Sequence, residues 1–265
     1  MKLTMLGTGN AGVTECYNTC FAIENEGEYL LVDGGGGNIL LRQLRKAGIR
    51  WQDIRSVFVT HRHTDHLMGI FWLMRMINNS RDGELAGKTI SFYGHDEVIS
   101  LIRNTTMGLF PREDGLHPAI RLNVLEDGQE FQAIGHTFRA FDIQSTKAKQ
   151  FGFTMHYGEG KTLTCCGDES YRECERTYVE GSTWLLHEAF CLETEAELFH
   201  PHEKQHSSVK DACELAERLG VENLLLYHTE EKNLARRKEL YTAEGRQYFF
   251  GNLYVPDDLD VLTLS

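Results

Sequence analysis

Residues 57–69 read Val-Phe-Val-Thr-His-Arg-His-Thr-Asp-His-Leu-Met-Gly and place three histidines and one aspartate within six positions. The apolar, β-branched and aromatic run at 57–59 that precedes them predicts a buried strand. Imidazole and carboxylate groups are ligands that zinc, manganese and iron(II) accept in proteins. The stretch therefore predicts a metal site at the carboxyl end of a buried strand.

The spacing of these side chains predicts room for two ions. His61 and His63 are two residues apart, so both can point to the same side of an extended segment and reach one ion. Asp65 and His66 lie beyond the expected turn and could reach a second ion, as in two-metal hydrolytic sites. The alternative interpretation is a polar loop that merely contains histidines, which this spacing behind a strand disfavours.

The pattern His-x-His-x-Asp-His formed by these four residues resembles the signature of the metallo-β-lactamase fold superfamily. Other fragments are similar to its ribonuclease Z branch and occur in the same order: Leu6-Gly7-Thr8-Gly9, Leu31-Val32-Asp33-Gly34, Gly167-Asp168, His187-Glu188-Ala189-Phe190, His206-Ser207-Ser208 and Leu226-Tyr227-His228. The resemblance implies an α/β fold, the αββα four-layer sandwich in which two mixed β-sheets are flanked by helices. Because no Pro-rich or Gly/Ser-rich linker divides the chain, we expect residues 1–265 to form a single domain.

The resemblance also implies a ligand set for two divalent ions. Its imidazole and carboxylate members are His61, His63, Asp65, His66, Asp168 and His228. His61 and His63 would serve the first ion, and Asp168 would bridge both ions with one oxygen each. Asp65 would also orient the attacking water. The alternative for Asp168 is a capping role after the strand expected at 163–166.

Three further polar residues would support this site by resemblance. Asp33 would orient the metal-binding loop, although simple helix capping is its alternative role. His206 precedes the helix expected at 209–219 and could stabilise a developing oxyanion or protonate a leaving group. Glu188 would orient His206. Without this motif, His206 would be interpreted as an ordinary loop histidine.

One expected metal ligand is missing. Ribonuclease Z enzymes carry a third histidine for the first ion a few residues before an aromatic-Gly-aromatic segment, here residues 151–153, and Ser145 or Thr146 occupies its place. A hydroxyl is a weak ligand compared with imidazole. Either the first site keeps His61 and His63 with a water or a histidine from elsewhere, or it binds its metal weakly and is often empty.

Four residues near this gap have two interpretations each. His200 and His202 could complete the first site, although an exposed pair of loop histidines is favoured. Lys147 and Lys149 could meet an anionic substrate, although solvated surface lysines are favoured.

The chain also departs from ribonuclease Z in lacking its flexible arm, which grips transfer RNA. Residues 153–166 leave room only for a hairpin through Tyr157-Gly158-Glu159-Gly160. The chain has 27 basic and 39 acidic residues, a formal net charge of −12, whereas proteins that grip long nucleic acids usually present a basic face. These features disfavour a large tRNA as a partner and favour a small anionic substrate.

Cysteine usage predicts a reducing compartment. The seven cysteines form no close-spaced disulfide framework and no secretory signal precedes them, so we expect a cytoplasmic protein. The pairs at 16 and 20 and at 165 and 166 are interpreted as packing residues rather than metal or redox sites. No segment approaches the roughly 18 uninterrupted apolar residues of a membrane span, so no membrane partner is expected.

The middle of the chain predicts a short helix at 97–103 followed by an irregular segment at 104–118. That segment could face the substrate or a second copy of the chain, and the family resemblance is compatible with a homodimer. Strands expected at 120–125, 129–134 and 137–143, with the turn signal Asp127-Gly128, predict a meander.

The predicted activity is hydrolysis of a phosphodiester bond in a small or short nucleotide-like substrate by a metal-activated water. Two divalent ions are expected, with zinc favoured over manganese or iron. Because the same fold hosts other hydrolases, a lactone or thioester hydrolase is an alternative. A catalytically silent metal-binding sensor module is another, since Ser145 and Thr146 weaken one site.

Overall fold

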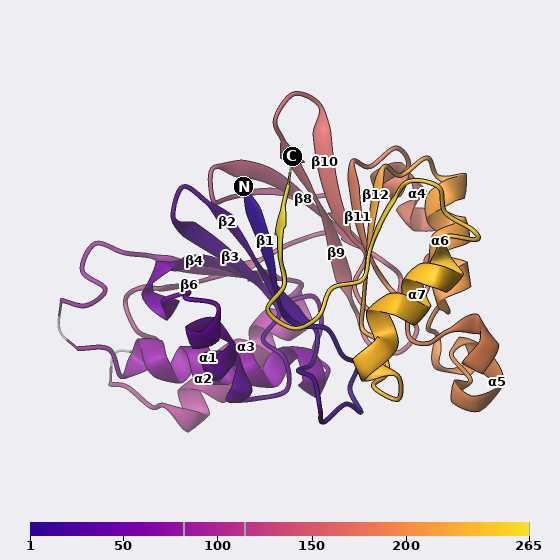
Figure 1. The fold of residues 1–265 in the computed structure, drawn as a ribbon. Coiled ribbons are helices and arrows are strands. Elements are labelled where there is room, and N and C mark those ends of the chain that lie inside the picture. Colours follow the sequence, from indigo (N-terminus) through magenta and orange to yellow (C-terminus); the bar gives the residue numbers. More distant parts are fainter. Residues whose placement is uncertain (82, 114, 265) are drawn as a thin grey trace.

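The computed structural model describes residues 1–81, 83–113 and 115–264, and within them two seven-stranded sheets face one another (Figure 1). The first sheet has the strand order β14-β1-β2-β3-β4-β5-β6. Its strands are β1 (Lys2–Gly7), β2 (Cys20–Asn25), β3 (Glu28–Val32), β4 (Ile54–Phe58), β5 (Ile90–Gly94), β6 (Ile120–Val124) and β14 (Val261–Thr263). It is mixed, because β1, β2 and β14 pair antiparallel whereas β3 to β6 run parallel.

The second sheet has the order β13-β12-β11-β10-β9-β8-β7. Its strands are β7 (Glu130–Ala133), β8 (His136–Asp142), β9 (Phe151–Tyr157), β10 (Lys161–Cys165), β11 (Trp184–Glu188), β12 (Asn223–Tyr227) and β13 (Asn252–Tyr254). Strands β10 to β13 run parallel, while β7, β8 and β9 pair antiparallel, so this sheet is mixed as well.

Helices cover the outer face of each sheet (Figure 1). They are α1 (Ile39–Lys46), α2 (Thr64–Asn78), α3 (Asp96–Leu109), α4 (Arg176–Val179), α5 (Ala196–Phe199), α6 (Val209–Arg218) and α7 (Arg237–Gly245). Short 3-10 turns lie at Trp51–Asp53, Glu173–Glu175, Glu193–Glu195, His202–Lys204 and Leu234–Arg236. Ser208 caps α6 by accepting a hydrogen bond from the Asp211 N–H, as expected for a serine at this position.

Three apolar layers follow from the alternation of side chains along buried strands. In β3, Leu31 packs toward α1 and α2, whereas Leu30 and Val32 pack between the two sheets. In β4, Val57 and Phe58 divide in the same way. A third layer joins the second sheet to α6 and α7. The predicted αββα sandwich of two mixed sheets is confirmed.

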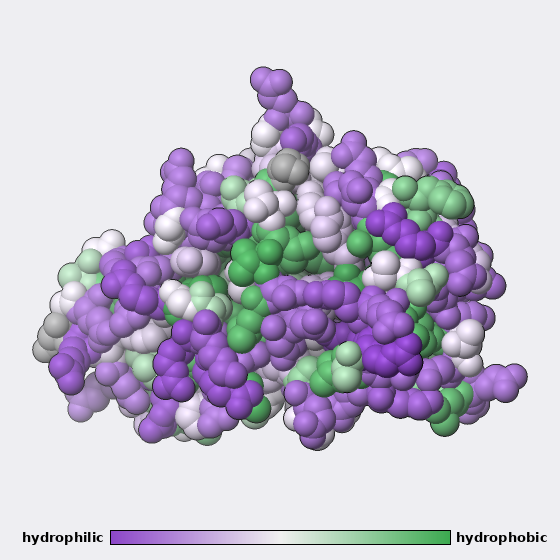
Figure 2. All heavy atoms as spheres, in the orientation of Figure 1, coloured by the Kyte–Doolittle hydropathy of each residue, from purple (hydrophilic) through white to green (hydrophobic). Residues whose placement is uncertain are grey.

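The surface is mostly hydrophilic in the view of Figure 2, and hydrophobic side chains gather in the middle of that face, over the seam between the two sheets. A crevice at this seam is lined by Trp184, Tyr254 and Leu262 among others. Within the described residues, no helix combines the length and the apolar character needed to cross a membrane.

Two expectations of local structure are wrong. The helix predicted at 97–103 continues to Leu109, because Ile102 and Thr106 are buried against the fold and outweigh the weak helix propensity of 104–108. The strand at 120–124 is not part of the predicted meander: β6 pairs with β5 in the first sheet, and of the three predicted strands only the other two, β7 and β8, pair with each other. Position 114, within the segment predicted to be irregular, lies outside the described residues.

Candidate metal centre

The predicted ligands meet where the carboxyl ends of strands from both sheets converge. His61 and His63 follow β4, Asp168 follows β10, and His228 follows β12. Backbone hydrogen bonds join the sheets here, from the Phe151 N–H to the Thr60 carbonyl at 3.0 Å. Parallel strands end at the same edge of a sheet, so residues more than 150 positions apart come into contact.

Four side chains form one group that could hold an ion: Asp65, His66, Asp168 and His228. All four are buried, and their ligand atoms lie within 4.8 Å of one another. The His66 Nε2 atom lies 3.3 Å from Asp65 Oδ2 and 3.4 Å from Asp168 Oδ2. The His228 Nε2 atom lies 3.7 Å from the same Asp168 oxygen.

A second group shares Asp168 and adds His61 and His63. The His61 Nε2 atom lies 2.8 Å from His63 Nδ1 and 3.5 Å from Asp168 Oδ2. His61 is fully buried and His63 is half-buried, so this group lies nearer to solvent than the first. The structure thus brings all six predicted ligand side chains together.

Hydrogen bonds behind the histidines determine which ring nitrogen faces the centre. The Thr60 hydroxyl donates to Asp33 Oδ2 at 2.7 Å, so it accepts the Nδ1–H of His61 at 2.9 Å. Asp33 Oδ2 also accepts the Nδ1–H of His66 at 2.7 Å. Both rings therefore direct Nε2 toward the centre, which is how supporting groups orient metal-binding histidines.

A threonine hydroxyl, here that of Thr19, also orients the ring of His228. The Thr19 hydroxyl donates to the Gly9 carbonyl at 3.0 Å and so accepts the Nδ1–H of His228 at 3.2 Å. Thr19 and Thr60 were missed at the level of sequence, because an isolated threonine carries no signal for this role. Only their contacts with a ligand histidine reveal it.

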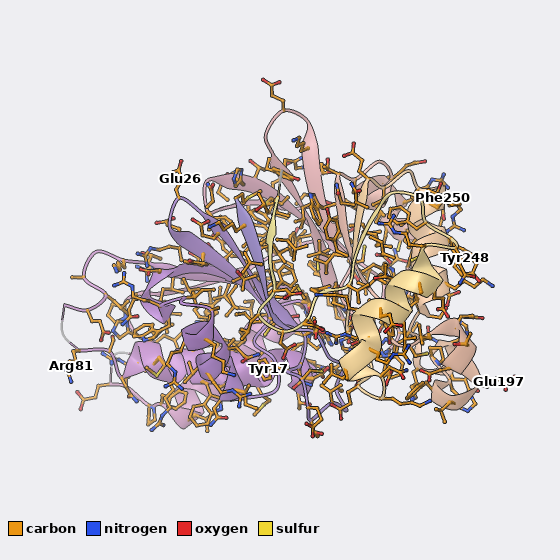
Figure 3. The ribbon with its side chains drawn as sticks, viewed as in Figure 1. Tyr17, Glu26, Arg81, Glu197, Tyr248 and Phe250 are labelled. Atoms are coloured by element: carbon orange, nitrogen blue, oxygen red, sulfur yellow. The ribbon has the colours of Figure 1, made fainter. Side chains whose placement is uncertain are left out.

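Close backbone approach holds Asp33 beneath the histidines. Gly34 donates its N–H to the His66 carbonyl at 2.7 Å, and a Cβ on Gly69 would lie 1.8 Å from the Gly34 oxygen. Glycine is therefore required at Gly69, where the loop crosses α2. The Tyr17 hydroxyl, at the lower centre of Figure 3, lies 2.7 Å from the Gly34 carbonyl and supports the same loop. Asp33 acts by hydrogen bonds to Thr60 and His66 rather than as a helix cap.

The electrostatics of the cluster suit a cation. Burial alone would raise the pKa of the Asp168 carboxyl, but His61, His66 and His228 hold it well below its usual range. Burial lowers the pKa of the His228 imidazole to about 3 and that of His61 well below 6.5. Against the effect of burial, the Asp65 and Asp33 carboxylates raise the pKa of His66. Ionised carboxylates and neutral His61 and His228 are the forms that bind a metal, and binding would release the proton of His66.

Two ligand atoms of the cluster lack hydrogen-bond partners, which also fits a metal site. Within the described part of the chain, the buried atoms His66 Nε2 and Asp168 Oδ1 have no hydrogen-bond partner. An unpartnered buried polar atom costs about 1–3 kcal/mol. A divalent ion coordinated by these atoms would remove that cost, so the residues fit the metal that the motif implies.

Glu188 and His206 lie beside this cluster. Glu188 Oε1 accepts the Ser207 N–H at 2.5 Å, and Glu188 Oε2 lies 3.5 Å from Nδ1 of His206. The His206 ring stacks on Phe190 at 4.9 Å between centroids and lies 5.3 Å from the ring of His228. Nδ1 thus faces Glu188, which leaves Nε2 as the ring nitrogen available to a substrate oxygen.

The residues that could have replaced the missing third histidine do not belong to either group of metal ligands. Ser145 points to Glu169, next to Asp168, whereas Thr146 is exposed. His200 is exposed beside Glu203, and the exposed His202 forms an ion pair with Asp211 at 2.7 Å. Among the described residues, the group around His61 includes no third histidine.

The two nearby lysines are engaged within the chain. Lys147 donates to the Lys204 carbonyl at 2.8 Å, and Lys149 pairs with Asp96 at 2.6 Å. The seven cysteines, all of them described, are free, and Cys165 and Cys166 are packed in the core.

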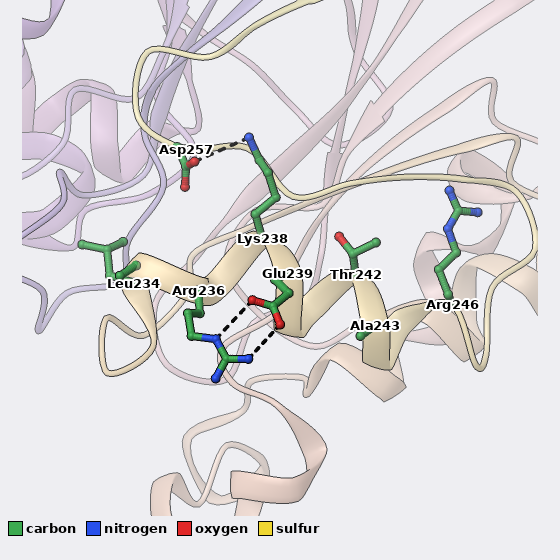
Figure 4. Close-up of a pocket in the computed structure, with 9 residues that line it drawn as sticks. Leu234, Arg236, Lys238, Glu239, Thr242, Ala243, Arg246 and Asp257 are labelled. Atoms are coloured by element: carbon green, nitrogen blue, oxygen red, sulfur yellow. Dashed lines mark hydrogen bonds and ion pairs between the residues drawn. The ribbon is translucent and has the colours of Figure 1, made fainter.

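A buried arginine supports the centre from the C-terminal helix, and the sequence carried no signal for it. Arg237 Nη1 donates to the hydroxyls of Thr8 and Thr229 at 2.9 and 2.8 Å, and Nη2 donates to the Pro256 carbonyl at 2.8 Å. Thr229 follows His228 directly. The opposite face of α7 and the 3-10 turn before it line a surface hollow with Arg236, Lys238 and Glu239 (Figure 4), and none of its lining residues belongs to the metal cluster.

Replacing Arg237 with methionine is expected to lower the free energy of unfolding by roughly 2–4 kcal/mol. Three buried acceptors would each lose a charged donor at a cost of about 1–3 kcal/mol, and local rearrangement would recover part of that cost. Urea denaturation measures this. Arg236→Met, in the 3-10 turn directly before α7, is the control and is expected to change stability little, since the Arg236 side chain is exposed and exposed ion pairs contribute little. Equal effects of the two substitutions would contradict the role of Arg237.

Comparisons with known proteins agree with this geometry. A family model described as anti-Pycsar protein Apyc1 matches residues 1–249. A ribonuclease Z from Thermococcus sibiricus is 24% identical over 316 aligned residues, which cover 100% of this chain and 97% of the relative. Among solved structures, the metallo-β-lactamase fold protein YhfI from Bacillus subtilis has a TM-score of 0.79, 19% identity and 99% coverage of both chains. The short form of human tRNase Z has a TM-score of 0.77, 22% identity and 100% coverage of both. The predicted resemblance to the metallo-β-lactamase fold and to its ribonuclease Z branch is confirmed.

Proposed function

This chain belongs to the family of the anti-Pycsar protein Apyc1, and we propose that it is a metal-dependent hydrolase that cleaves a phosphodiester bond in a small, nucleotide-like anionic substrate. The observation that carries the proposal is the pair of ligand groups that share the buried Asp168 carboxylate beside His206. Two adjoining sites of this kind are the arrangement that two-metal hydrolases use. Zinc is the ion we propose, with manganese or iron as alternatives.

The proposed chemistry divides between the ions and the side chains. His61 and His63 would hold one divalent ion, Asp65, His66 and His228 would hold another, and Asp168 belongs to both groups. When bound, such ions lower the pKa of a water that can serve as the nucleophile. In this proposal the Asp65 carboxylate accepts a hydrogen bond from that water and so orients it. Desolvation by the surrounding residues strengthens each electrostatic contact in the site.

On the leaving-group side, His206 would act through Nε2. A proton held there can be donated to the departing oxygen, which is the general-acid role of a histidine near neutral pH. Glu188 Oε2 lies 3.5 Å from Nδ1 and would orient the ring by attraction to a protonated imidazole, and Phe190 stacks on the ring and would restrict its tilt. Both act as positioning residues for His206.

The β9–β10 connection and the charge of the chain favour a small substrate. The two strands are joined by a turn at 158–160, which leaves no arm of the kind that ribonuclease Z enzymes use to hold transfer RNA. The net charge of −12 also opposes a long polyanion. A small phosphodiester therefore fits better than a large tRNA.

The test is hydrolysis of a chromogenic phosphodiester, bis(p-nitrophenyl) phosphate, by metal-stripped protein reconstituted separately with zinc and with manganese. We expect metal-dependent turnover that Asp65→Asn lacks. Turnover of a lactone or thioester panel without phosphodiester turnover would replace the proposal with the alternative hydrolase. No turnover in either assay, with metal bound, would leave a silent metal-binding module.

We also propose that the chain is a single domain over residues 1–265 and acts in the cytoplasm. Two copies would form a homodimer through α2 and α3. The groove between these helices is lined by large apolar side chains, and Met68, Trp72, Leu101 and Leu109 are 41%, 38%, 37% and 58% exposed. An exposed apolar patch that is bordered by polar side chains, here Arg62 and Arg75, is typical of an interface between proteins.

Trp72→Glu tests the interface, because a charge at its centre would oppose burial. Light scattering after size-exclusion chromatography is expected to give a dimer mass for the wild type and a monomer mass for the variant. Phe250→Glu, at the other end of the molecule (Figure 3) and 77% exposed, is the matched control and should stay dimeric. A monomeric wild type, or a dimeric Trp72→Glu, would contradict the assignment.

A further inference from the structure

We propose that the two metal sites are unequal and load in order: the group of Asp65, His66, Asp168 and His228 binds its ion first and tightly, and the group of His61, His63 and Asp168 binds a second ion weakly and exchangeably. The inference rests on the two-metal site of the proposed function, but it concerns ion binding and does not require turnover. It assigns the difference to the side chain of Ser145.

The donor sets of the two groups differ in number and in burial. The tight group has four side chains, all buried, with two carboxylates that balance the charge of a divalent cation. The weak group has three, with only the shared Asp168 as a carboxylate, and His63 is partly exposed. Four protein ligands are typical of closed zinc sites, whereas three leave an open position that water or a ligand fills.

Ser145 cannot serve as the missing ligand, because its hydroxyl is already saturated. It donates to Glu169 Oε1 at 2.5 Å and accepts the N–H groups of Lys147 at 3.1 Å and Ala148 at 3.3 Å. A serine hydroxyl offers one donor and two acceptor positions. No lone pair therefore remains for an ion.

The contacts of Glu169 hold this segment in place. The Glu169 carboxylate is 2% exposed, lies 3.1 Å from Arg172 Nη2 and 3.9 Å from Lys147 Nζ. Turning Ser145 toward the ions would remove its hydrogen bond to the buried Glu169 carboxylate. Losing a hydrogen bond to a charged group costs more free energy than losing one between neutral groups. Because Lys147 and Arg172 both lie beside the Glu169 carboxylate, Glu169 adds no net negative charge near the weak site.

Other side chains do not fill the gap. Thr146 is exposed, and His200 and His202 are exposed beside Glu203 and Asp211. In the described parts of the chain, His61 and His63 share their group with Asp168 alone. Occupancy of the weak site therefore depends on the concentration of free metal, so metal supply would set the fraction of molecules with two ions.

The test counts ions rather than turnover. Metal-stripped protein is titrated with Zn²⁺ against a competing chelator, and native mass spectrometry counts the ions that remain after dialysis. We expect the wild type to retain one ion and to bind the second at least about tenfold more weakly, the lower end of what a lost supporting partner costs a metal site. Ser145→His should convert it to a protein that retains two.

Thr146→His is the matched control, since it adds the same imidazole one residue away at an exposed position, and it should behave as the wild type. Retention of two ions by Thr146→His but not by Ser145→His would overturn the assignment to Ser145. Two equally tight ions in the wild type would overturn the inequality itself.

A second pair of variants does not depend on folding of Ser145→His. His63→Ala should remove only the weak binding event, whereas His228→Ala should remove the tight one, and loss of the tight event in His63→Ala would overturn the assignment of the sites. Unequal binding without hydrolysis of any ester would keep this inference and reject the proposed function. Hydrolysis with two equally tight ions would do the reverse.

Discussion

Asp168→Asn is expected to abolish hydrolysis, by at least about 10³-fold in kcat/KM, and to lower zinc content below one ion per chain. Supporting groups alone are worth about 10–100-fold in metal affinity or activity, and Asp168 belongs to both ligand groups. Asparagine keeps the shape of the side chain but removes the charge that offsets two cations. Zinc content by elemental analysis and turnover of the chromogenic phosphodiester measure the two effects.

The control for Asp168→Asn is Asp142→Asn, since Asp142 lies at the end of β8 and belongs to neither metal group. It should keep wild-type zinc content and turnover. Both variants are expected to show the wild-type circular dichroism spectrum. An Asp168→Asn protein that remains active with two ions bound would reject the bridging role and the two-site mechanism with it.

His206→Ala is expected to lower kcat by about 10²–10⁴-fold, the usual contribution of general acid–base catalysis, with zinc content unchanged. The expectation follows from the position of His206 beside His228 and outside both ligand groups. A substrate with a good leaving group, such as p-nitrophenolate, needs less protonation, so the loss should be smaller with it than with an alkyl leaving group. That dependence separates a proton donor from a merely structural residue.

Glu188→Gln should reproduce part of the loss in His206→Ala, because the amide orients the ring less strongly than the carboxylate. His202→Ala is the matched control: it removes a histidine from the same loop, where the side chain is exposed and paired with Asp211. It should leave kcat unchanged. A full loss of zinc in His206→Ala would make His206 a ligand and contradict its assignment as a proton donor.

The local elements and the centre of the fold could be predicted from the sequence, because their signals lie within a few residues. The run at 57–59 and the cluster that follows it indicated a strand that ends in a metal loop, and β4 with α2 has that arrangement. The helix predicted over 209–219 from its apolar face and a preceding serine cap is observed as α6. The six ligand side chains were predicted by resemblance to a family, and the structure brings them into two groups.

Errors arose where the outcome depends on a partner distant in sequence. Ile120 to Val124 carries the pattern of a strand, but only its pairing with β5 places it in the first sheet instead of in a meander with β7. The helix α3 passes through residues of low helix propensity because packing of Ile102 and Thr106 stabilises it. Neither partner can be read from the segment itself.

Residue types and spacing alone indicated imidazoles and carboxylates behind a buried strand and the absence of one expected imidazole at 145–146. The groups that support those imidazoles are evident only in three dimensions, since Thr19 contacts His228 across 209 positions and Arg237 contacts Thr8 across 229. The tertiary structure also shows why Ser145 cannot bind an ion, since its hydroxyl donates to Glu169 and accepts two backbone N–H groups. Residue type sets what a side chain can bind, but geometry sets which of its bonds are already taken.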